Sequence, residues 1–198
     1  MKILVAGATG KTGTRLMHKL EAGGHQPIAL VRESSDTSQL PTTAEQRTGD
    51  LTDLPEGVCN GCSAVIFAAG SGGDTDAEMT DKVDREGAKR LIDQATEANV
   101  QRFSMLSSAG AENPDSDSEM GNYLQAKHDA DEHLKRSGLN FAIIRPVALT
   151  DEDGHGRMRF GDEVDLKGEA ARGDVASVLA DSVTSDRWTN RVERMQSV

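Results

Sequence analysis

Ser107, Tyr123 and Lys127 are three side chains whose types and spacing suit proton transfer. Tyr123 and Lys127 are four residues apart, so they share one face if the segment is helical. A free tyrosine, with a pKa of about 10, is too weak a base at neutral pH, but a nearby ammonium favours the phenolate and makes proton transfer with a substrate oxygen feasible. Ser107 ends the preceding predicted strand, where its hydroxyl can orient a substrate carbonyl. Because this Tyr–Lys spacing occurs often by chance, the alternative is an exposed tyrosine beside a solvated lysine.

The start of the chain carries a second pattern, a glycine turn between a predicted strand and a predicted helix. Residues 3–6 form an apolar run without alternation, which is typical of a parallel strand buried on both faces. Gly7 lets the chain turn sharply, Gly10 leaves room for a pyrophosphate beside the backbone, and Gly13 lets the helix pack closely on the strand. The free N–H groups and the positive end of that helix would face the phosphates. The pattern predicts a nicotinamide dinucleotide at Gly7, Thr9, Gly10, Lys11, Thr12 and Gly13.

The same residues allow two other interpretations. Gly10, Lys11 and Thr12 spell the end of a nucleoside-triphosphate P-loop, but that motif needs a glycine five positions before Gly10, where this chain has Val5. A purely structural glycine turn that holds no ligand is the second alternative.

Arg32 ends the second predicted strand, about where this type of fold meets the adenosine ribose. A guanidinium there pairs with the 2′-phosphate of NADP, whereas an acidic residue would favour NAD, so we expect NADP and regard NAD as the less favoured cofactor. Asp50 can bind the adenine amino group while Leu51 covers the ring. The alternatives are a surface arginine and an ordinary turn aspartate.

Strand and helix patterns alternate along the chain. Apolar runs predict strands over residues 28–31, 64–69, 102–107 and 141–145, with a short strand ending near Gly49. Helices are predicted over 81–99, with Val83, Gly87, Leu91, Ala95 and Ala98 along one face, and over 123–136. Alternation of this kind predicts an α/β fold, a Rossmann-like doubly wound parallel sheet in one domain over residues 1–198.

Three acidic stretches interrupt the alternation, at residues 71–80, 111–121 and 150–162. The first two follow strands at the carboxyl edge of the sheet, where such folds bind ligands. They are candidate lids, and solvated loops are the alternative.

The net charge and the hydropathy of the chain limit the classes of partner that it can bind. The chain has 33 acidic and 22 basic residues among 198, a formal charge of −11. That charge repels nucleic acid and anionic membranes, so we expect a small-molecule substrate and a monomer or homodimer. With no apolar run of about 18 residues and a strand at the very start, we expect a cytoplasmic protein. Few aromatic residues on an acidic surface also suit a salt-adapted organism, which is a hypothesis.

Other cysteine, histidine and aspartate clusters match the spacing of zinc, redox or calcium sites poorly. Cys59 and Cys62 lack a second pair for zinc and precede a strand, so we expect structural thiols, with redox or metal chemistry as the alternative. The segment from Asp151 to Asp162 nearly matches a calcium loop, but His155 replaces an oxygen ligand and no helix precedes it. His128 and His133 are five residues apart and do not share a helix face.

Taken together, the motifs resemble those of the atypical short-chain dehydrogenase/reductase superfamily. The chain is most similar to its small NAD(P)H-binding members related to flavin and biliverdin reductases, NmrA-like sensors and nucleoside-sugar epimerases. The resemblance covers nearly the whole length and rests on residues 7–13, 30–32, 49–51, 67–70, 106–110, 123–127 and 144–146.

The resemblance implies further site residues and leaves the reaction open. Cofactor contacts are implied for Lys127, which would hold the nicotinamide ribose, and for Ala68, Ala69, Gly70, Pro146, Val147, Ala148 and Leu149. The acidic residue of NAD-using relatives aligns nearest Val31, which supports NADP, and Asp174 is similar to the family's C-terminal helix start. Residues 147–198 would complete the sheet and form a small substrate side. The expected function is an NADPH-dependent reductase of a small carbonyl, quinone or flavin-like acceptor; the alternatives are a non-catalytic redox sensor and a sugar epimerase or dehydratase.

Overall fold

The apolar run that opens the chain is strand β1 (Lys2–Ala6) in the computed structural model, which describes residues 1–71 and 76–198. Ile3 and Val5 pack into the core on one face of the sheet, and Leu4 and Ala6 pack into the core on the other face. Because both faces are covered, the strand needs no polar alternation.

The sheet has the order β3-β2-β1-β4-β5-β6-β10-β8, and only its last pairing, between β10 and β8, is antiparallel among the described residues. Its other strands are β2 (Gln26–Val31), β3 (Glu45–Thr48), β4 (Ala64–Phe67), β5 (Arg102–Leu106), β6 (Asn140–Pro146), β8 (Met158–Phe160) and β10 (Arg191–Ser197). The strand order reverses between β1 and β4, which is where doubly wound sheets open a crevice at their carboxyl ends. The predicted Rossmann-like α/β fold is confirmed, with an antiparallel edge strand that was not predicted.

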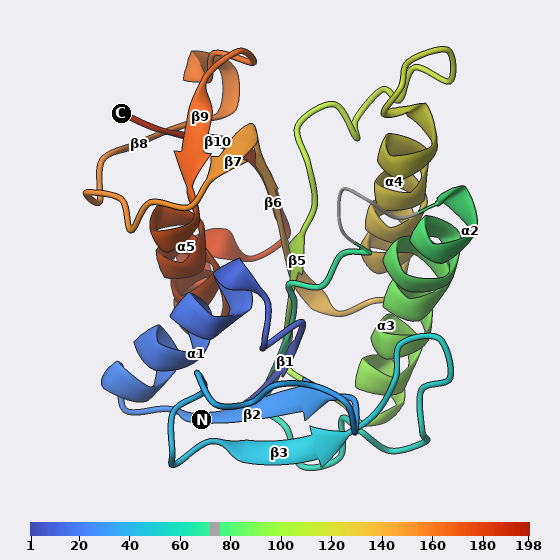
Figure 1. Cartoon of the computed structure of the whole chain (residues 1–198), viewed down its shortest axis with the longest axis vertical. Helices are drawn as coiled ribbons and strands as arrows, with labels where there is room; N and C mark the ends of the chain where they lie inside the picture. The colour runs from blue at the N-terminus through green and yellow to red at the C-terminus, as the bar shows by residue number, and fades with distance from the viewer. Residues whose placement is uncertain (72–75) are drawn as a thin grey trace.

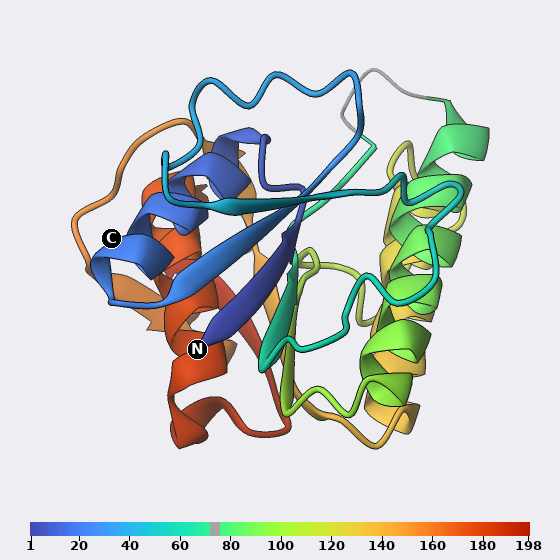
Figure 2. The ribbon, with the colours of Figure 1, turned by 90° about the horizontal axis from the view of Figure 1, so that it is seen from below.

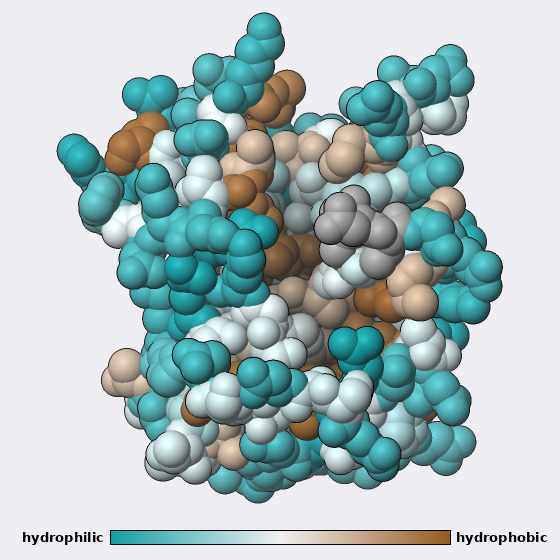
Figure 3. Space-filling view, viewed as in Figure 1, coloured by the Kyte–Doolittle hydropathy of each residue, from teal (hydrophilic) through white to brown (hydrophobic). Residues whose placement is uncertain are grey.

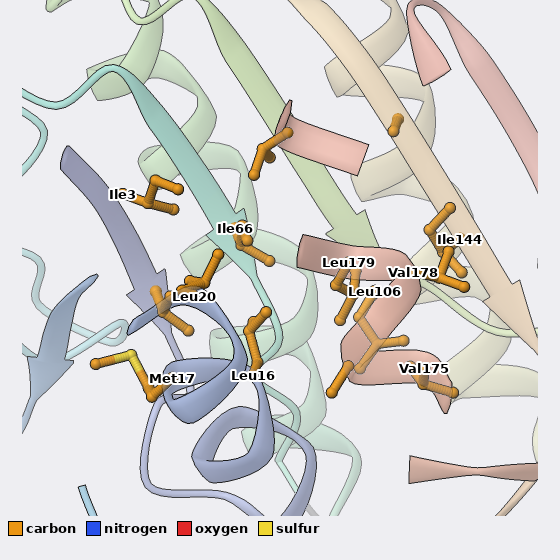
Figure 4. Packing of buried hydrophobic residues seen from close by; sticks show 14 of the residues in the cluster. Ile3, Leu16, Met17, Leu20, Ile66, Leu106, Ile144, Val175, Val178 and Leu179 are labelled. Carbon is orange, nitrogen blue, oxygen red and sulfur yellow. The ribbon is translucent and has the colours of Figure 1, made fainter. Parts of the chain in front are cut away.

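Helices cover both faces of the sheet (Figures 1 and 2). On one face, α1 (Lys11–Ala22) packs beside α5 (Arg172–Thr184), and α5 begins close to the predicted Asp174. Leu16 and Leu20 of α1 meet the same core as Val178 and Leu179 of α5 (Figure 4). The other face is covered by α3 (Ala88–Glu97) and α4 (Gly121–Arg136).

The helix predicted from residue 81 to 99 begins earlier and is not uniform. It starts as α2 (Ala77–Thr80), where the Asp76 side chain accepts a hydrogen bond from the Met79 amide at 2.8 Å, and continues as a π-helical segment, η1 (Asp81–Gly87), into α3. The wider turn of a π-helix changes which side chain faces inward. Asp84 is fully buried and Val83 only partly, so the predicted facing was wrong at this position.

The segment after β6 adds β7 (Ala148–Thr150) and β9 (Glu169–Ala171), which pair in parallel outside the main sheet, and the short helices η2 (Gly161–Glu163) and η3 (Asp186–Trp188). The candidate lid at residues 71–80 includes 72–75, which lie outside the described residues. Within the described chain, no helix combines the length and apolar character needed to cross a bilayer.

Candidate functional site

The carboxyl ends of the central strands and the start of α1 lie on the same side of the molecule, at the top of Figure 2. Figure 3 views this side face on. Its surface is hollowed near the centre, and hydrophobic residues line the floor of the hollow. Most of the predicted site residues follow strands that end at this carboxyl edge.

The glycine turn after β1 has the close contacts predicted for it. Gly7 has a φ of +82°, and a Cβ there would lie 2.6 Å from backbone atoms of Ala69. A Cβ on Gly13 would lie 2.0 Å from the carbonyl oxygen of Gly7. Only glycine allows these approaches, which bring α1 and the loop after β4 against the turn.

The start of α1 offers backbone donors at the hollowed edge, and among the described residues they have no acceptor. Gly10 is its N-cap residue and provides no side-chain cap, and the first intrahelical bond runs from the Thr14 amide to the Gly10 carbonyl at 2.8 Å. The amides of Lys11, Thr12 and Gly13 consequently have no intrahelical acceptor. Three such donors at the positive end of a helix fit a diphosphate.

Cations on the first turns of α1 are paired with the acidic segment that follows β7. Lys11 Nζ lies 2.5 Å from Asp151 Oδ2, and Arg15 Nε lies 2.9 Å from Asp153 Oδ1. The hydrogen bond from Lys11 lowers the pKa of Asp151. Asp151 and Asp153, which lie in the segment that nearly matches a calcium loop, thus face cations of α1, and the segment is held against the glycine turn.

At the far end of the edge, Arg32 is exposed just after β2, and its amide donates to Ser35 Oγ at 3.0 Å. Asp50 Oδ1 accepts hydrogen bonds from the Thr52 amide and hydroxyl, both at 2.8 Å. These bonds, with a smaller contribution from Arg32, lower the pKa of Asp50. Leu51 is partly buried against the α3 side. Arg32 and Asp50 therefore lie near each other, with one carboxylate oxygen of Asp50 used in its own turn.

Lys127 is buried beneath the edge, with 2% of its side chain exposed, and is paired with a carboxylate that was not predicted. Its Nζ lies 2.9 Å from Asp84 Oδ1, 3.3 Å from the Leu106 carbonyl and 3.4 Å from the Ala69 carbonyl. Burial alone would lower the pKa of Lys127, but the attraction of Asp84 outweighs it and raises the pKa of Lys127 above its ordinary value. The Nζ is 5.6 Å from the ring centroid of the half-buried Tyr123, so the predicted Tyr–Lys pair is brought together.

Ser107 lies in a second buried network. Its hydroxyl donates to Asp131 Oδ2 at 2.8 Å, and the same oxygen accepts from Arg145 Nε at 3.1 Å and Nη2 at 2.9 Å. Burial raises the pKa of Asp131, against the opposing effect of Arg145 and of the Ser107 hydrogen bond. The Ser107 hydroxyl, on a residue that is 3% exposed, is therefore directed at Asp131 in this structure.

Asp84 and Asp131 are the two site residues that the sequence interpretation missed. Each lies on the buried face of an amphipathic helix: Asp84 is four residues before the buried Ala88, and Asp131 is four residues after Lys127. A charged side chain at an apolar helical position requires a buried partner, and this was the signal available for Asp131. Regular helical periodicity places Val83 inward, so it gave no such signal for Asp84.

The remaining predicted contacts lie on loops at the same edge. Ala68, Ala69 and Gly70 follow the end of β4 at Phe67, and Ala69 touches both the glycine turn and Lys127. Pro146 and Val147 are buried, whereas Ala148 and Leu149 are exposed on β7.

The cysteines and histidines considered above lie apart from these groups. Cys59 and Cys62 are free and buried, and burial raises the pKa of Cys59 to about 12, the opposite of what a reactive thiol needs. His128 Nδ1 lies 2.8 Å from the Ala111 carbonyl oxygen, and His133 Nε2 lies 2.6 Å from Asp93 Oδ1.

Comparisons with known proteins agree with this architecture. A Bacillus subtilis protein named as an uncharacterized sugar epimerase is 36% identical over 197 residues, which cover 96% of this chain and 92% of the relative. A solved structure from Bacillus halodurans, named as a candidate NAD-dependent epimerase/dehydratase, is 33% identical with a TM-score of 0.92, covering 100% of this chain and 94% of that one. An oxidoreductase from Lactococcus lactis is 31% identical with a TM-score of 0.86, covering 100% and 91%.

The model of the family described as NAD(P)H-binding matches residues 7–186, a range that runs from the glycine turn through α5. The chain therefore belongs to the NAD(P)H-binding family, and the relatives and solved structures that it matches are named as epimerase-like proteins and an oxidoreductase.

Proposed function

We propose that this protein is an NADP(H)-dependent oxidoreductase that reduces a small carbonyl, quinone or flavin-like acceptor. The observation that carries the proposal is a juxtaposition: the glycine turn that leads into α1 and the Tyr123–Lys127 pair both adjoin the loop after β4, at the carboxyl edge of the sheet. They are linked there by Ala69, which contacts Gly7 on one side and Lys127 on the other.

The residues present fit the cofactor. Lys11, Thr12 and Gly13 would donate to the diphosphate, and exposed Gly10 leaves the approach open because it has no Cβ. Arg32 would pair with a 2′-phosphate, and no acidic residue precedes it on β2 to favour a free ribose hydroxyl. When bound, NADPH supplies the hydride.

Tyr123 would supply the proton. In the reductive direction its phenol donates a proton to the acceptor oxygen while the hydride adds to the carbonyl carbon, which leaves an alcohol and a phenolate that solvent reprotonates. Lys127 would fix the position of the phenol and the local charge. The loop residues after β4 and the Pro146–Leu149 segment would border the nicotinamide and the acceptor.

Two observations support alternative functions. The name of the Bacillus subtilis relative favours an epimerase acting on a sugar. The engagement of Lys127 by Asp84 and of Ser107 by Asp131 favours a cofactor-binding sensor without turnover.

The cofactor assignment is tested by titrating the purified protein with NADPH and NADH. Arg32→Ala should weaken NADPH binding at least tenfold, as expected from losing a charge-assisted pair worth about 1.5–3 kcal/mol, and should leave NADH binding nearly unchanged. Arg136→Ala, which removes an exposed arginine at the far end of α4, is the matched control. Equal affinity of the unsubstituted protein for both nucleotides would contradict the NADP assignment.

The reaction is tested with a panel of quinones, flavins, small carbonyl compounds and nucleotide sugars. Tyr123→Phe should abolish reduction and leave cofactor affinity within about twofold, because the hydroxyl contributes to proton transfer rather than to binding. Unchanged turnover would remove Tyr123 from the mechanism. Conversion of a nucleotide sugar without net consumption of cofactor would establish the epimerase alternative.

A further inference from the structure

We propose that Asp84 is a positioning residue that acts through Lys127 to keep the Tyr123 phenol protonated, which fits the site to reduction rather than oxidation. This inference rests on the proposed function and adds to it a residue and a direction.

The geometry places Asp84 at the junction of three elements. It lies in the π-helical segment η1 with no exposed surface, and its Oδ1 is 2.9 Å from Lys127 Nζ on α4. Its Oδ2 accepts a hydrogen bond from the Ser71 amide, in the loop after β4, at 2.9 Å. π-helical turns are rare and are found frequently at functional sites, since they direct a side chain that a regular helix would turn away.

The charge of Lys127 would otherwise act strongly on Tyr123. The ammonium is 5.6 Å from the Tyr123 ring centroid and is almost fully buried, where a charge is poorly screened. An unpaired ammonium there would favour phenolate. With a carboxylate 2.9 Å from the ammonium, the pair is close to a dipole and its effect on the phenol is much smaller.

Most other charges on the packed elements have ion-pair partners of their own among the described residues, whereas Arg90 of α3 donates to backbone carbonyls, including that of Leu51 at 2.7 Å. Asp131, the second carboxylate that acts on Lys127, shares its Oδ2 with Arg145 of β6. On η1, Arg85 pairs with Asp81 and with Asp129 of α4.

On α2 and α3, the nearby ions pair with partners on η1: Glu78 with Lys82, and Lys89 with Glu86. Asp84 is therefore the carboxylate whose removal leaves Lys127 without a direct ion-pair partner among the described residues. The resulting protonated phenol is the proton donor that reduction requires.

The chain makes this measurable without cofactor or substrate, because Tyr123 is its only tyrosine. The ultraviolet absorbance of phenolate, followed against pH, reports Tyr123 alone. Asp84→Asn should move the titration midpoint down by about one pH unit. Lys127→Met should move it up, because it removes the cation and leaves the negative charge of Asp84 unpaired in the same buried site. The double variant, which removes both charges, should titrate near the unsubstituted protein. Asp81→Asn, which removes a carboxylate three residues away on the same segment, should leave the midpoint unchanged.

A midpoint that stays in place or rises in Asp84→Asn would overturn the proposal, as would equal shifts in Asp84→Asn and Asp81→Asn. If Asp84→Asn does not fold, the comparison of Lys127→Met with the double variant isolates the same carboxylate: the double variant must titrate at lower pH, and equal midpoints overturn the proposal.

The failure of this inference is distinguishable from failure of the proposed function. The absorbance titration requires no turnover, so it tests the effect of Asp84 on Tyr123 independently of the proposed reaction. With an active acceptor, the basic limb of the reduction rate should move with the absorbance midpoint in Asp84→Asn. An absorbance shift without a shift in the rate profile would leave the electrostatic coupling intact and remove Tyr123 from catalysis.

Discussion

The two ends of the carboxyl edge are built in opposite ways. At the α1 end, the donors are backbone amides, and the cations Lys11 and Arg15 are held by exposed partners, with Asp153 89% exposed. At the α4 end, Lys127, Asp84 and Asp131 are almost completely buried and paired. Exposed pairs are weak and exchange partners readily, whereas a buried pair is costly to break. The ion pairs at the α1 end can therefore exchange their partners, whereas those at the α4 end hold a fixed geometry.

The largest expected effect comes from breaking a buried pair at the α4 end. Asp131→Ala removes the acceptor of both Arg145 and Ser107 and should lower the free energy of unfolding by about 3–5 kcal/mol, measured by urea denaturation. Asp129→Ala, two residues earlier on α4, removes a carboxylate that is 3.5 Å from Arg85 and partly exposed. It should cost less than about 1 kcal/mol. Similar losses for both variants would mean that burial does not set the cost of breaking an ion pair at the α4 end.

Glycine substitutions separate packing from ligand binding at the α1 end. Gly13→Ala places a Cβ 2.0 Å from the Gly7 carbonyl oxygen, so α1 must shift. We expect a loss of about 3 kcal/mol in the free energy of unfolding. Gly10→Ala has a permitted φ of −75° and a nearest contact of 3.3 Å, so it should cost less than about 1 kcal/mol.

Gly10→Ala should have little effect on stability but a large effect on cofactor affinity. Its Cβ would occupy the approach of the diphosphate, and calorimetry should find NADPH binding at least tenfold weaker in Gly10→Ala. Unchanged affinity would contradict the position assigned to the diphosphate.

The smallest expected effect concerns partner exchange. Asp151→Asn frees Lys11 from a carboxylate that competes with phosphate, so NADPH affinity should rise about twofold at low salt, and the difference should vanish at high salt. Glu163→Gln, which neutralises an exposed carboxylate on η2, is the control for net charge. A loss of affinity in Asp151→Asn would mean that Asp151 helps to bind the cofactor rather than competing with it.

Local patterns in the sequence were enough to predict the first strand, the glycine turn and the pairing of the site residues on one helix. The apolar run at residues 3–6 and the spacing of Gly7 and Gly13 predicted a buried strand and a close turn, because backbone sterics depend on residue type and little else. The pairing of Tyr123 with Lys127 followed from helical spacing. Boundaries were less exact: β4 ends at Phe67 rather than Ala69, and α4 begins at Gly121 rather than Tyr123.

Composition, spacing and the order of strands and helices determined by themselves the α/β class, the glycine turn and the face shared by Tyr123 and Lys127. Tertiary structure alone decided that Asp84, on a π-helical turn, meets Lys127 and that Ser107 faces Asp131. Residues 84 and 127 are 43 positions apart, and a buried charge is stable only beside the partner that the packing of separate helices supplies. Helical periodicity predicts that a position faces inward, but the partner that its side chain meets depends on how the helices pack against the sheet.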